Sequence, residues 1–488
     1  MSEVKRRDLR IVVIGAGMAG ILSAIKLREA GYTNFVIYEK AARMGGTWRE
    51  NTYPGIACDV PAHLYTYTFE PNPNWSHVFA PGHEIRAYFE GVAEKYQVTP
   101  SIRFNTEITR CVFEHGRWQL TTGAGARDSA DVVIAASGVL HYPNLPELPG
   151  LADFKGACFH SARWNHDLAL EGKRVGVIGT GSTAIQITSA LVDKVAKFEL
   201  FQRTPQWVMP IENPAYSAQE RAAFAADVAR IMSVRDEAKR MMTDFIANAV
   251  IDADSKEMAS IEKACRDNLE RSVVDPVLRE KLRPDYRPAC KRLIFSADFY
   301  QAIQHRNAEL VTAGIERVEA AGIRTSDGRL HELDVLVMAT GFRADRFIRP
   351  TVVTGRGGLS LDAVWADRPI AYLSLSVPGF PNMFLLNGPN GPVGNFSLIQ
   401  IAEMQLGYVL QLLDKLRDGE CREICATASA TNAFDKARVE AAKGSIWSTG
   451  CKSWYLDKFG VPASWPWSYA RFADEMAVPK FEAYEQVA

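Results

Sequence analysis

The chain has 488 residues, 47% of them hydrophobic, and its 56 Lys and Arg nearly balance its 57 Asp and Glu, for a net charge of -1. This length and apolar content are sufficient for large buried cores in two or three domains. The balanced charge argues against a protein that binds nucleic acid or an anionic membrane surface, because such proteins are usually strongly basic. No apolar stretch is long enough to span a bilayer, so no membrane span is expected.

The eight cysteines show no regular spacing, and the closest pair, Cys421 and Cys425, has three residues between its members. The absence of a C-x-x-C pair argues against a zinc site, an oxidised secreted framework and the redox dithiol of a disulfide reductase. We therefore expect no metal site and a reduced, cytoplasmic location.

The first chemical motif is G-A-G-M-A-G, whose glycines are Gly15, Gly17 and Gly20. It follows the apolar run 10–14, and a helical pattern after it ends near Gly31. A second apolar run, 35–38, then ends at Glu39. In such a strand–helix–strand unit the glycines allow a tight turn, close approach of the backbone to a pyrophosphate, and close helix–strand packing. Glu39 is placed to accept hydrogen bonds from ribose hydroxyls.

A second glycine-rich segment covers residues 45–59 and reads GGTWRENTYPGIACD. Its Gly-Gly pair again suggests backbone lying against a ligand, and Tyr53-Pro54-Gly55 predicts a turn. Asp59 is either a solvated loop acid or a functional carboxylate on a loop that a rigid scaffold holds.

A second dinucleotide fingerprint, G-T-G-S-T-A, follows the apolar run 174–178, with Gly179, Gly181 and Ala184 in its three positions. Glu39 lies 24 residues after Gly15, and Arg203 lies 24 residues after Gly179. A carboxylate at this position suits a free ribose 2′-hydroxyl, whereas an arginine suits a 2′-phosphate. The first site therefore predicts FAD or NAD and the second predicts NADPH. The alternative for Arg203 is a solvated cation at a strand end.

The middle of the chain, 212–285, predicts a helical insertion, with N-cap signatures at Ser217 and at Asp275. Lys291 and Arg292 follow an irregular segment and, on composition alone, would be read as surface residues. The C-terminal tail is rich in Trp and Tyr, which is typical of a satellite core or of a loop that covers a ligand.

With these motifs in place, the chain resembles the class B flavoprotein monooxygenases, and most closely the type I Baeyer–Villiger monooxygenases. The resemblance covers nearly the whole chain. Besides the two fingerprints in order, it rests on three motifs, which are Gly46-x-Trp48-x4-Tyr53-Pro54-Gly55-x3-Asp59, Phe154-x-Gly156-x3-His160-x3-Trp164 and Ala339-Thr340-Gly341-Phe342. Relatives that oxidise heteroatoms usually carry Tyr or Phe at the Trp164 position. Asn165 stands where the family usually has Pro or Asp.

The resemblance implies an α/β fold with two Rossmann-like dinucleotide-binding domains. We expect a discontinuous FAD-binding domain in two parts, 1–145 and 338–488, the second of which includes a segment covering the substrate and NADP. An NADPH-binding domain, 152–335, is inserted between them and carries the helical insertion.

The implied activity is NADPH- and O2-dependent conversion of a ketone to an ester or lactone through a C4a-peroxyflavin. The implied contacts of FAD are Gly15, Gly17, Ala19, Gly20, Glu39, Gly46, Thr47, Trp48, Asp59, Tyr65 and Ile108. Those of NADPH are Thr180, Gly181, Ser182, Thr183, Gln186, Arg203 and Thr204, with Lys291, Arg292 and Trp454.

By the same resemblance, Arg292 is the central catalytic residue, because a fixed guanidinium stabilises an oxyanion in a water-poor site. Asp59 would orient Arg292, and Lys291 would lie beside NADPH. We interpret His160 and Trp164, which lie between the two nucleotide sites, as hinge and alignment residues. Trp454 matches a family position on a mobile loop that closes over NADP.

Three alternatives stay open. The same scaffold oxidises sulfur or nitrogen centres in related enzymes, a two-dinucleotide disulfide reductase is disfavoured by the missing dithiol, and a non-catalytic FAD- or NADP-binding module would show no turnover. The expected partners are a small ketone and O2. The identity of the ketone, which the loops 387–396 and 446–456 would select, and the oligomeric state are left undetermined.

Overall fold

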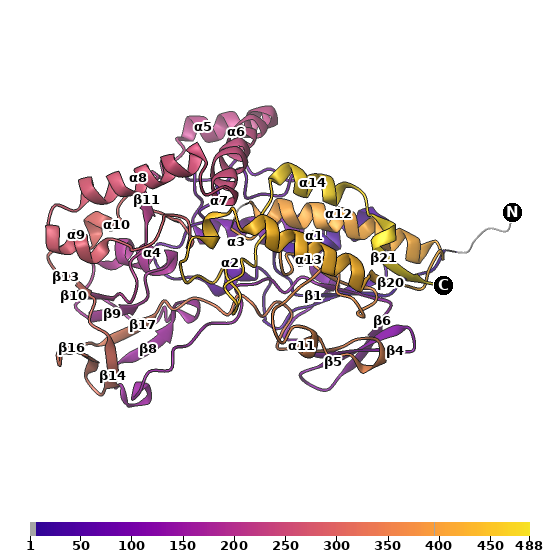
Figure 1. Cartoon of the computed structure of the whole chain (residues 1–488), viewed down its shortest axis with the longest axis horizontal. Helices are drawn as coiled ribbons and strands as arrows, with labels where there is room; N and C mark the ends of the chain where they lie inside the picture. Colours follow the sequence, from indigo (N-terminus) through magenta and orange to yellow (C-terminus); the bar gives the residue numbers. More distant parts are fainter. Residues whose placement is uncertain (1–5, 395) are drawn as a thin grey trace.

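The computed structural model of the protein describes residues 6–394 and 396–488. Two parallel five-stranded sheets occupy the two halves of the molecule, side by side along its long axis (Figure 1). The chain begins in the first half, passes through the second half and returns, so the first half is built from both ends of the sequence.

The first sheet has the strand order β19-β7-β1-β2-β3 and is parallel throughout. Its strands are β1 (Ile11–Ile14), β2 (Phe35–Tyr38), β3 (Ile102–Arg103), β7 (Val132–Ala135) and β19 (Met383–Leu385). All four residues of β1 are buried, because both faces of the sheet are covered. Alternate side chains of β1 enter different cores, Ile11 and Val13 on the helical side, and Val12 and Ile14 on the other side.

Helices cover one face of the first sheet, and a small meander covers the other. The helices that pack together there are α1 (Met18–Glu29), α3 (Gly82–Lys95), α12 (Leu398–Arg417) and α14 (Tyr469–Ala477), as Figure 1 shows. The meander has the order β18-β4-β5-β6, with β4 (Ile108–Glu114), β5 (Arg117–Thr122), β6 (Arg127–Ala130) and β18 (Val352–Thr354). The C-terminal third thus supplies α12 to the first half.

The second sheet has the order β13-β10-β9-β17-β8 and is also parallel. Its strands are β8 (Ala157–His160), β9 (Arg174–Ile178), β10 (Lys197–Phe201), β13 (Ala308–Val311) and β17 (Val335–Met338). Around β9 the order repeats that around β1, so both halves follow the Rossmann-like plan that the fingerprints predicted. Helix α4 (Ser182–Leu191) follows β9, and a small antiparallel sheet, β14 (Ile315–Glu319), β15 (Gly322–Thr325) and β16 (Leu330–Glu332), follows β13.

The segment 154–165 between the two fingerprints is an integral part of the second sheet. Its residues 157–160 form β8, an edge strand whose His160 pairs with Met338 of β17. A single 3-10 turn, Ser161–Arg163, follows the strand. The chain therefore enters the second half through β8 and leaves it through the neighbouring strand β17.

The predicted helical insertion is present and reaches over toward the first half (Figure 1). Its elements are α5 (Ala218–Ala226), α6 (Val228–Arg240), the π-helix η4 (Met241–Ala247), α7 (Asn248–Ile251), α8 (Lys256–Ser272) and α9 (Pro276–Leu282). Ser217 forms the predicted capping box with Glu220, and Asp275 caps α9. Buried Arg235 of α6 donates to the Thr66 hydroxyl at 2.9 Å, which fastens the insertion to the first half.

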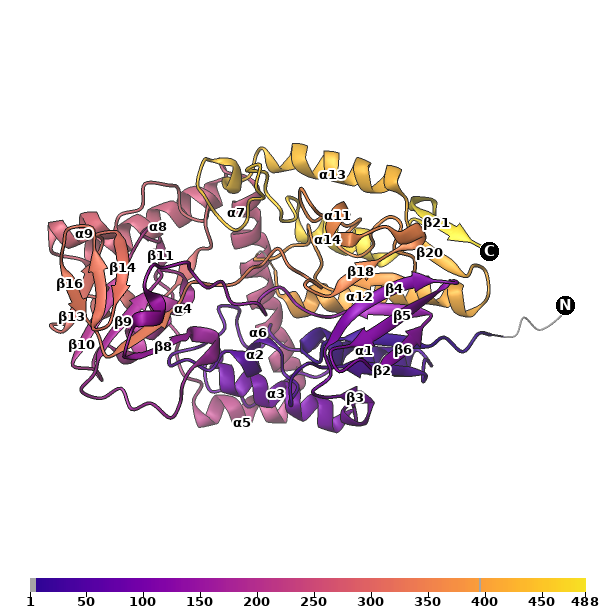
Figure 2. The same ribbon diagram turned by 90° about the horizontal axis from the view of Figure 1, so that it is seen from below.

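The remaining elements are short or lie near the C-terminus, where α13 runs along one edge of the molecule (Figure 2). They are α2 (Thr47–Glu50), α10 (Phe299–Ala302), α11 (Leu361–Val364), α13 (Ala428–Ala442), and the pairs β11 (Val208–Met209) with β12 (Ile294–Phe295) and β20 (Glu423–Ala426) with β21 (Tyr484–Val487). Among the described residues, no helix has both the length and the apolar character that crossing a membrane requires.

Candidate active site

A cradle of bare backbone lies at the carboxyl end of β1. Gly15 has a φ of +102°, and a Cβ there would lie 2.7 Å from the carbonyl oxygen of Ala136. A Cβ on Gly20 would lie 1.9 Å from the Gly15 carbonyl oxygen, and one on Gly46 would lie 3.0 Å from the Cα of Gly17. Gly17 also begins α1 without a side-chain cap. The free helix N-terminus and the absence of side chains fit a pyrophosphate.

Glu39 closes the ribose side of this cradle. The residue is 4% exposed, and its Oε2 accepts a hydrogen bond from the Ala16 N–H at 2.8 Å. Its Oε1 accepts from the Ala41 N–H and from Nη1 of Arg49, each at 2.9 Å. Because a carboxylate offers about four acceptor positions, capacity remains for a ribose hydroxyl.

An ion-pair chain that the motif analysis missed runs from Glu39 toward the second half. Nη2 of Arg49 donates to Oε1 of Glu50 at 2.6 Å, and Arg163 after β8 donates to the other oxygen of Glu50. Burial alone would raise the pKa of Glu50, but Arg49 and Arg163 outweigh it and lower that pKa below its ordinary value. The carboxylate thus stays charged and links the ribose side of the first site to the segment that enters the second half.

The other residues predicted to bind FAD do not all meet at the cradle. Thr47 and Trp48 begin α2, and Nε1 of Trp48 donates to the Tyr65 hydroxyl at 3.2 Å. Ala19 lies buried in the first turn of α1. Ile108 lies in β4, where its side chain is in the hydrophobic core and its carbonyl accepts from the Thr351 hydroxyl, so its side chain is not part of the cradle.

The second fingerprint forms a matching cradle at the carboxyl end of β9. Gly179 has a φ of +123°, and a Cβ there would lie 2.3 Å from the carbonyl oxygen of Ala339. Gly181 begins α4 without a side-chain cap, which leaves the helix N–H groups of Ser182 and the following residues available. The Thr180 hydroxyl donates to the carbonyl of Thr204 at 2.7 Å, and this bond ties the turn to the end of β10.

Two cations, Arg203 and Lys291, lie close together beside this second cradle. Arg203 is exposed and, within the described part of the chain, makes no hydrogen bond or ion pair. Nζ of Lys291 lies 4.6 Å from the ring centre of Tyr286. Burial and then the charge of Arg203 lower the pKa of Lys291, while Asp285 opposes them. Two neighbouring cations that contact no carboxylate suit a dianionic 2′-phosphate.

The Tyr53-Pro54-Gly55 turn is the contact between the two cradles. The Tyr53 hydroxyl donates to Oε1 of Gln186 at 2.9 Å and accepts from the Thr183 hydroxyl at 3.3 Å. Gly55 has a φ of +81°, and a Cβ there would lie 2.5 Å from the Gln186 carbonyl oxygen. The Gln186 side chain also donates to the Ala57 carbonyl at 3.1 Å. Two residues predicted to bind NADPH therefore also join the two halves.

Asp59 and Arg292 are brought together where the halves meet. Nη2 of Arg292 donates to Oδ2 of Asp59 at 2.5 Å, and the two side chains are 29% and 28% exposed. Burial alone would lower the pKa of Arg292, but Asp59, and next Tyr455, raise it above its ordinary value. The guanidinium is therefore a permanent cation, held by a carboxylate from the first half.

Both ring nitrogens of His160 form hydrogen bonds to backbone groups. Its Nδ1 accepts from the Ala162 N–H at 3.1 Å, and its Nε2 donates to the Gly341 carbonyl at 3.1 Å. Burial lowers the pKa of His160, so the ring is neutral near pH 7. The Trp164 ring packs edge-on against Phe159 at 5.2 Å. These contacts tie the two crossings between the halves together and leave no ring nitrogen free for proton transfer.

Three features of the site escaped the sequence analysis. The Tyr455 hydroxyl lies 3.5 Å from Nη1 of Arg292, the Gly394 carbonyl accepts from the same Nη1 at 3.1 Å, and Cys290 forms a disulfide with Cys451. The expectation of a reduced chain is therefore wrong for Cys290 and Cys451. The two cysteines are separated by 161 residues, so their spacing could not reveal the bond. The sequence offered two signals for the contacts to Arg292, namely the glycine-rich loop 387–396, which contains Gly394, and the Trp454-Tyr455 pair in the tail. Asn395 of that loop lies outside the described residues.

Trp454 lies next to Tyr455 on the loop 446–456. Its residue surface is 47% exposed, and its ring lies tilted against that of Tyr455 with a centroid distance of 4.2 Å. An exposed indole beside a buried phenol suits a loop with one face toward a ligand.

Within residues 6–394 and 396–488, one group of acidic and histidine side chains is close enough to share a metal, namely Glu199, Glu309 and His331. Lys197 already contacts Glu199 at 2.7 Å, and Arg329 binds Glu309. This group is an ion-pair network at the β13 edge of the second sheet, in which cations already neutralise the carboxylates.

The chain matches the family model described as flavin-binding monooxygenase-like over residues 8–353. It is 45% identical to an uncharacterized monooxygenase of Mycobacterium tuberculosis over 97% of this chain and 95% of that protein. It is 39% identical to a Baeyer–Villiger monooxygenase of Streptomyces coelicolor over 97% and 92% of the two chains. Among solved structures, cyclohexanone monooxygenase of Rhodococcus sp. Phi1 bound to NADP+ superposes with a TM-score of 0.88 at 28% identity, over 98% and 99% of the two chains. The chain therefore belongs to the flavin-binding monooxygenase-like family, and within it to the type I Baeyer–Villiger monooxygenases.

Proposed function

We propose that the protein is an FAD- and NADPH-dependent monooxygenase that uses O2 to convert ketones to esters or lactones. The observation that carries this proposal is the Asp59–Arg292 pair. It places a permanent cation where the two nucleotide cradles meet. An enzyme that only oxidised NADPH would need no such cation at that point, because it would form no substrate oxyanion to stabilise.

Both cradles fit their cofactors. The side-chain-free contact of Gly17 with Gly46 accommodates a pyrophosphate, and the unpaired Arg203 beside Lys291 accommodates a 2′-phosphate. Bound FAD and NADPH supply hydride transfer and the activation of O2. The work of the chain is to hold these groups, to exclude water and to stabilise the charge that develops on the substrate.

Arg292 performs the last of these tasks. Addition of an oxygen nucleophile to a ketone turns the carbonyl oxygen into an oxyanion, which is stabilised most by donors that are already oriented. One N–H of Nη2 and one of Nη1 are used by Asp59 and Gly394, so further guanidinium N–H groups remain for the substrate. Asp59 holds the guanidinium in place and balances its charge when no oxyanion is present.

The remaining predicted site residues are assigned supporting roles. His160 and Trp164 align the two halves, since their side chains are engaged in structural contacts at the crossing strands. Trp454, which is exposed on the loop 446–456, would close over bound NADP. The cofactor contacts are those inferred above for each cradle, with Ile108 contributing through its backbone.

We infer the domain bounds in the same terms: an FAD-binding domain in the parts 1–145 and 338–488, and an NADPH-binding domain over 152–335 with the insertion 212–285. The strand β17, Val335–Met338, is the return crossing between them. We infer the cytoplasm as the compartment, since six of the eight cysteines are free thiols.

The nearest rival is oxidation of sulfur or nitrogen centres on the same scaffold, and Trp164 favours the ketone reaction by its resemblance to that branch. The decisive experiment reduces the purified holoenzyme with NADPH without air, then adds O2 with a panel of ketones, sulfides and amines. Ester or lactone formed in proportion to NADPH consumed is the expected result. Products confined to S- or N-oxides would assign the rival reaction, and NADPH oxidation indifferent to every substrate would refute both.

A further inference from the structure

The loop after α13 brings a phenol to the catalytic arginine. We propose that Tyr455 is a positioning residue for Arg292, and that the Cys290–Cys451 disulfide is the tether that keeps Tyr455 in place. This inference rests on the function proposed above and extends it: the reactive geometry of Arg292 would depend on the redox state of two cysteines.

The guanidinium of Arg292 is held from two sides. Asp59 of the first half binds Nη2 at 2.5 Å, whereas the Gly394 carbonyl at 3.1 Å and the Tyr455 hydroxyl at 3.5 Å lie at Nη1. Gly394 has a φ of +90°, and a Cβ there would lie 2.2 Å from the Tyr455 hydroxyl oxygen. The three groups are therefore packed around a single position of the guanidinium, and a bulkier residue at position 394 would displace the phenol.

The Tyr455 side chain has little freedom of its own. The residue is 4% exposed, and its ring contacts those of Trp447 at 5.6 Å and Trp454 at 4.2 Å. Its carbonyl accepts from the Ala463 N–H at 2.7 Å. Movement of the hydroxyl relative to Arg292 thus requires movement of the whole loop.

The disulfide between Cys290 and Cys451 limits movement of the part of the loop that precedes Tyr455. Cys290 lies two residues before Arg292, and Cys451 lies four residues before Tyr455. The bond therefore joins two very short segments, one ending in the guanidinium and the other in the hydroxyl that contacts it. A covalent link at this point removes most of the conformations in which the two groups are apart.

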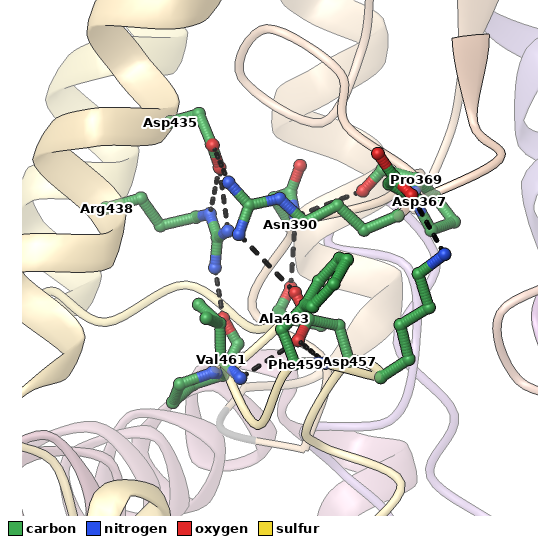
Figure 3. A network of polar contacts seen from close by, with 12 residues as sticks. Asp367, Pro369, Asn390, Asp435, Arg438, Asp457, Phe459, Val461 and Ala463 are labelled. Carbon is green, nitrogen blue, oxygen red and sulfur yellow. Dashed lines mark hydrogen bonds and ion pairs between the residues drawn. The ribbon is translucent and has the colours of Figure 1, made fainter.

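A buried polar network holds the downstream side, as Figure 3 shows. Asp457, two residues after Tyr455, accepts from the N–H groups of Phe459 and Val461, each at 2.9 Å. Arg438 of α13, whose side chain is 1% exposed, binds Asp435 at 2.7 Å and also donates to the carbonyl of Pro462. Tyr455 thus lies between two restrained positions. On one side are the polar contacts of Asp457 and Pro462, and on the other is the disulfide at Cys451, which reduction can break.

Reduction of the Cys290–Cys451 disulfide releases the restraint on the segment that precedes Tyr455. A dithiol reductant donates two electrons and two protons, the S–S bond breaks, Cys290 and Cys451 become thiols, and the reductant closes into its own cyclic disulfide. Asp59 and the downstream network stay in place. The expected consequence is an Arg292 that remains charged but less well oriented, which lowers ester formation without affecting hydride transfer from NADPH.

The hydroxyl is tested with Tyr455→Phe, which retains both ring contacts. Tyr32→Phe is the matched control, because it removes a buried hydroxyl that bonds Asp414 far from the site. In the holoenzyme we expect Tyr455→Phe to lower the ester formed per NADPH about fivefold, with unchanged flavin reduction, FAD content and Tm. Wild-type yield in Tyr455→Phe would overturn the positioning role, and so would a loss that parallels lower Tm or FAD content.

The tether is tested by thiol counting and by hydrogen exchange of the loop 446–456. Mass spectrometry of the holoenzyme, alkylated after denaturation without a reductant, should find six free thiols, because five of these six are buried in the fold; prior treatment with dithiothreitol should expose the remaining two. Dithiothreitol and the Cys290→Ser/Cys451→Ser variant should both accelerate exchange in the loop and lower ester yield, and the variant should not respond to the reductant. Eight free thiols before reduction, or unchanged loop exchange after it, would overturn the tether.

These outcomes are distinct from failure of the proposed function. The wild type is assayed first with the ketone panel, and absence of any ester from it would refute the function. A wild type that forms ester, alongside a Tyr455→Phe variant and a reduced protein that both form as much, would refute the further inference alone.

Discussion

Replacement of Asp59 by Asn tests whether the charge that holds Arg292 matters for oxygenation. The substitution preserves the shape of the side chain and one acceptor oxygen, but removes its negative charge. Two unit charges 4 Å apart attract by about 4 kcal/mol at an effective dielectric of about 20, and the closest atoms of this pair are 2.5 Å apart. Because the side chains are 29% and 28% exposed, solvent screens part of that attraction, and the amide oxygen still accepts a hydrogen bond. We therefore expect a net loss of about 1.5–3 kcal/mol of orientation energy.

A loss of this size corresponds to a decrease in ester formation of about 10- to 150-fold, since 1.36 kcal/mol is tenfold in rate. The flavin should still be reduced by NADPH at close to the wild-type rate, because Arg292 remains charged and both cradles are intact. Stopped-flow reduction without air, followed by product analysis after addition of O2 and ketone, separates the two steps. Asp267→Asn, a surface carboxylate paired with Lys263, is the control for removal of an acid. Ester formation within threefold of wild type would refute the proposed role of the pair.

Arg292→Ala should abolish ester formation while still permitting flavin reduction.

Four further predictions concern the nucleotide sites and the joint between them. Arg203→Ala should lower kcat/KM for NADPH about 30-fold and leave NADH unchanged, since a charged bidentate contact to phosphate is lost; equal losses for both would contradict the 2′-phosphate assignment. Because Arg203 and burial lower the pKa of Lys291, NADPH affinity should weaken as pH rises through that lowered pKa, and in Arg203→Ala the weakening should move to higher pH. His160→Ala, which loses the bonds to Ala162 and Gly341, should reduce ester per NADPH while FAD stays bound; unchanged kinetics would make the segment 154–165 a passive spacer. Gly55→Ala, whose Cβ would meet the Gln186 carbonyl, should raise KM for NADPH several-fold with FAD content intact, whereas Gly91→Ala, which has open space around it, should have no effect.

The local sequence rules accounted for much of the architecture. The βαβ units around Gly15 and Gly179, and the caps at Ser217 and Asp275, are formed where the residue patterns predicted them. Each of these features depends on residues within a few turns of chain, so hydrophobic period, glycine placement and cap chemistry specify it.

The contrast between Glu39 and Arg203 is likewise a property of sequence. The two residues occupy equivalent strand ends in two copies of one unit, and the sign of the charge distinguishes a ribose from a 2′-phosphate. Asp59 and Arg292, by contrast, could be paired only by resemblance, because 233 residues separate them.

Tertiary structure alone decided how the two halves meet. It made residues 157–160 an edge strand beside β17, turned Tyr53-Pro54-Gly55 into the contact with α4, and brought Arg163 to Glu50. It also joined Cys290 to Cys451 and placed Tyr455 at Arg292. Such contacts join residues far apart in the chain and leave no periodic or spacing signal, because they follow from the packing of whole sheets and loops. The sequence by itself thus determined which groups are available for the chemistry, and the packing of the two halves determined which of them touch.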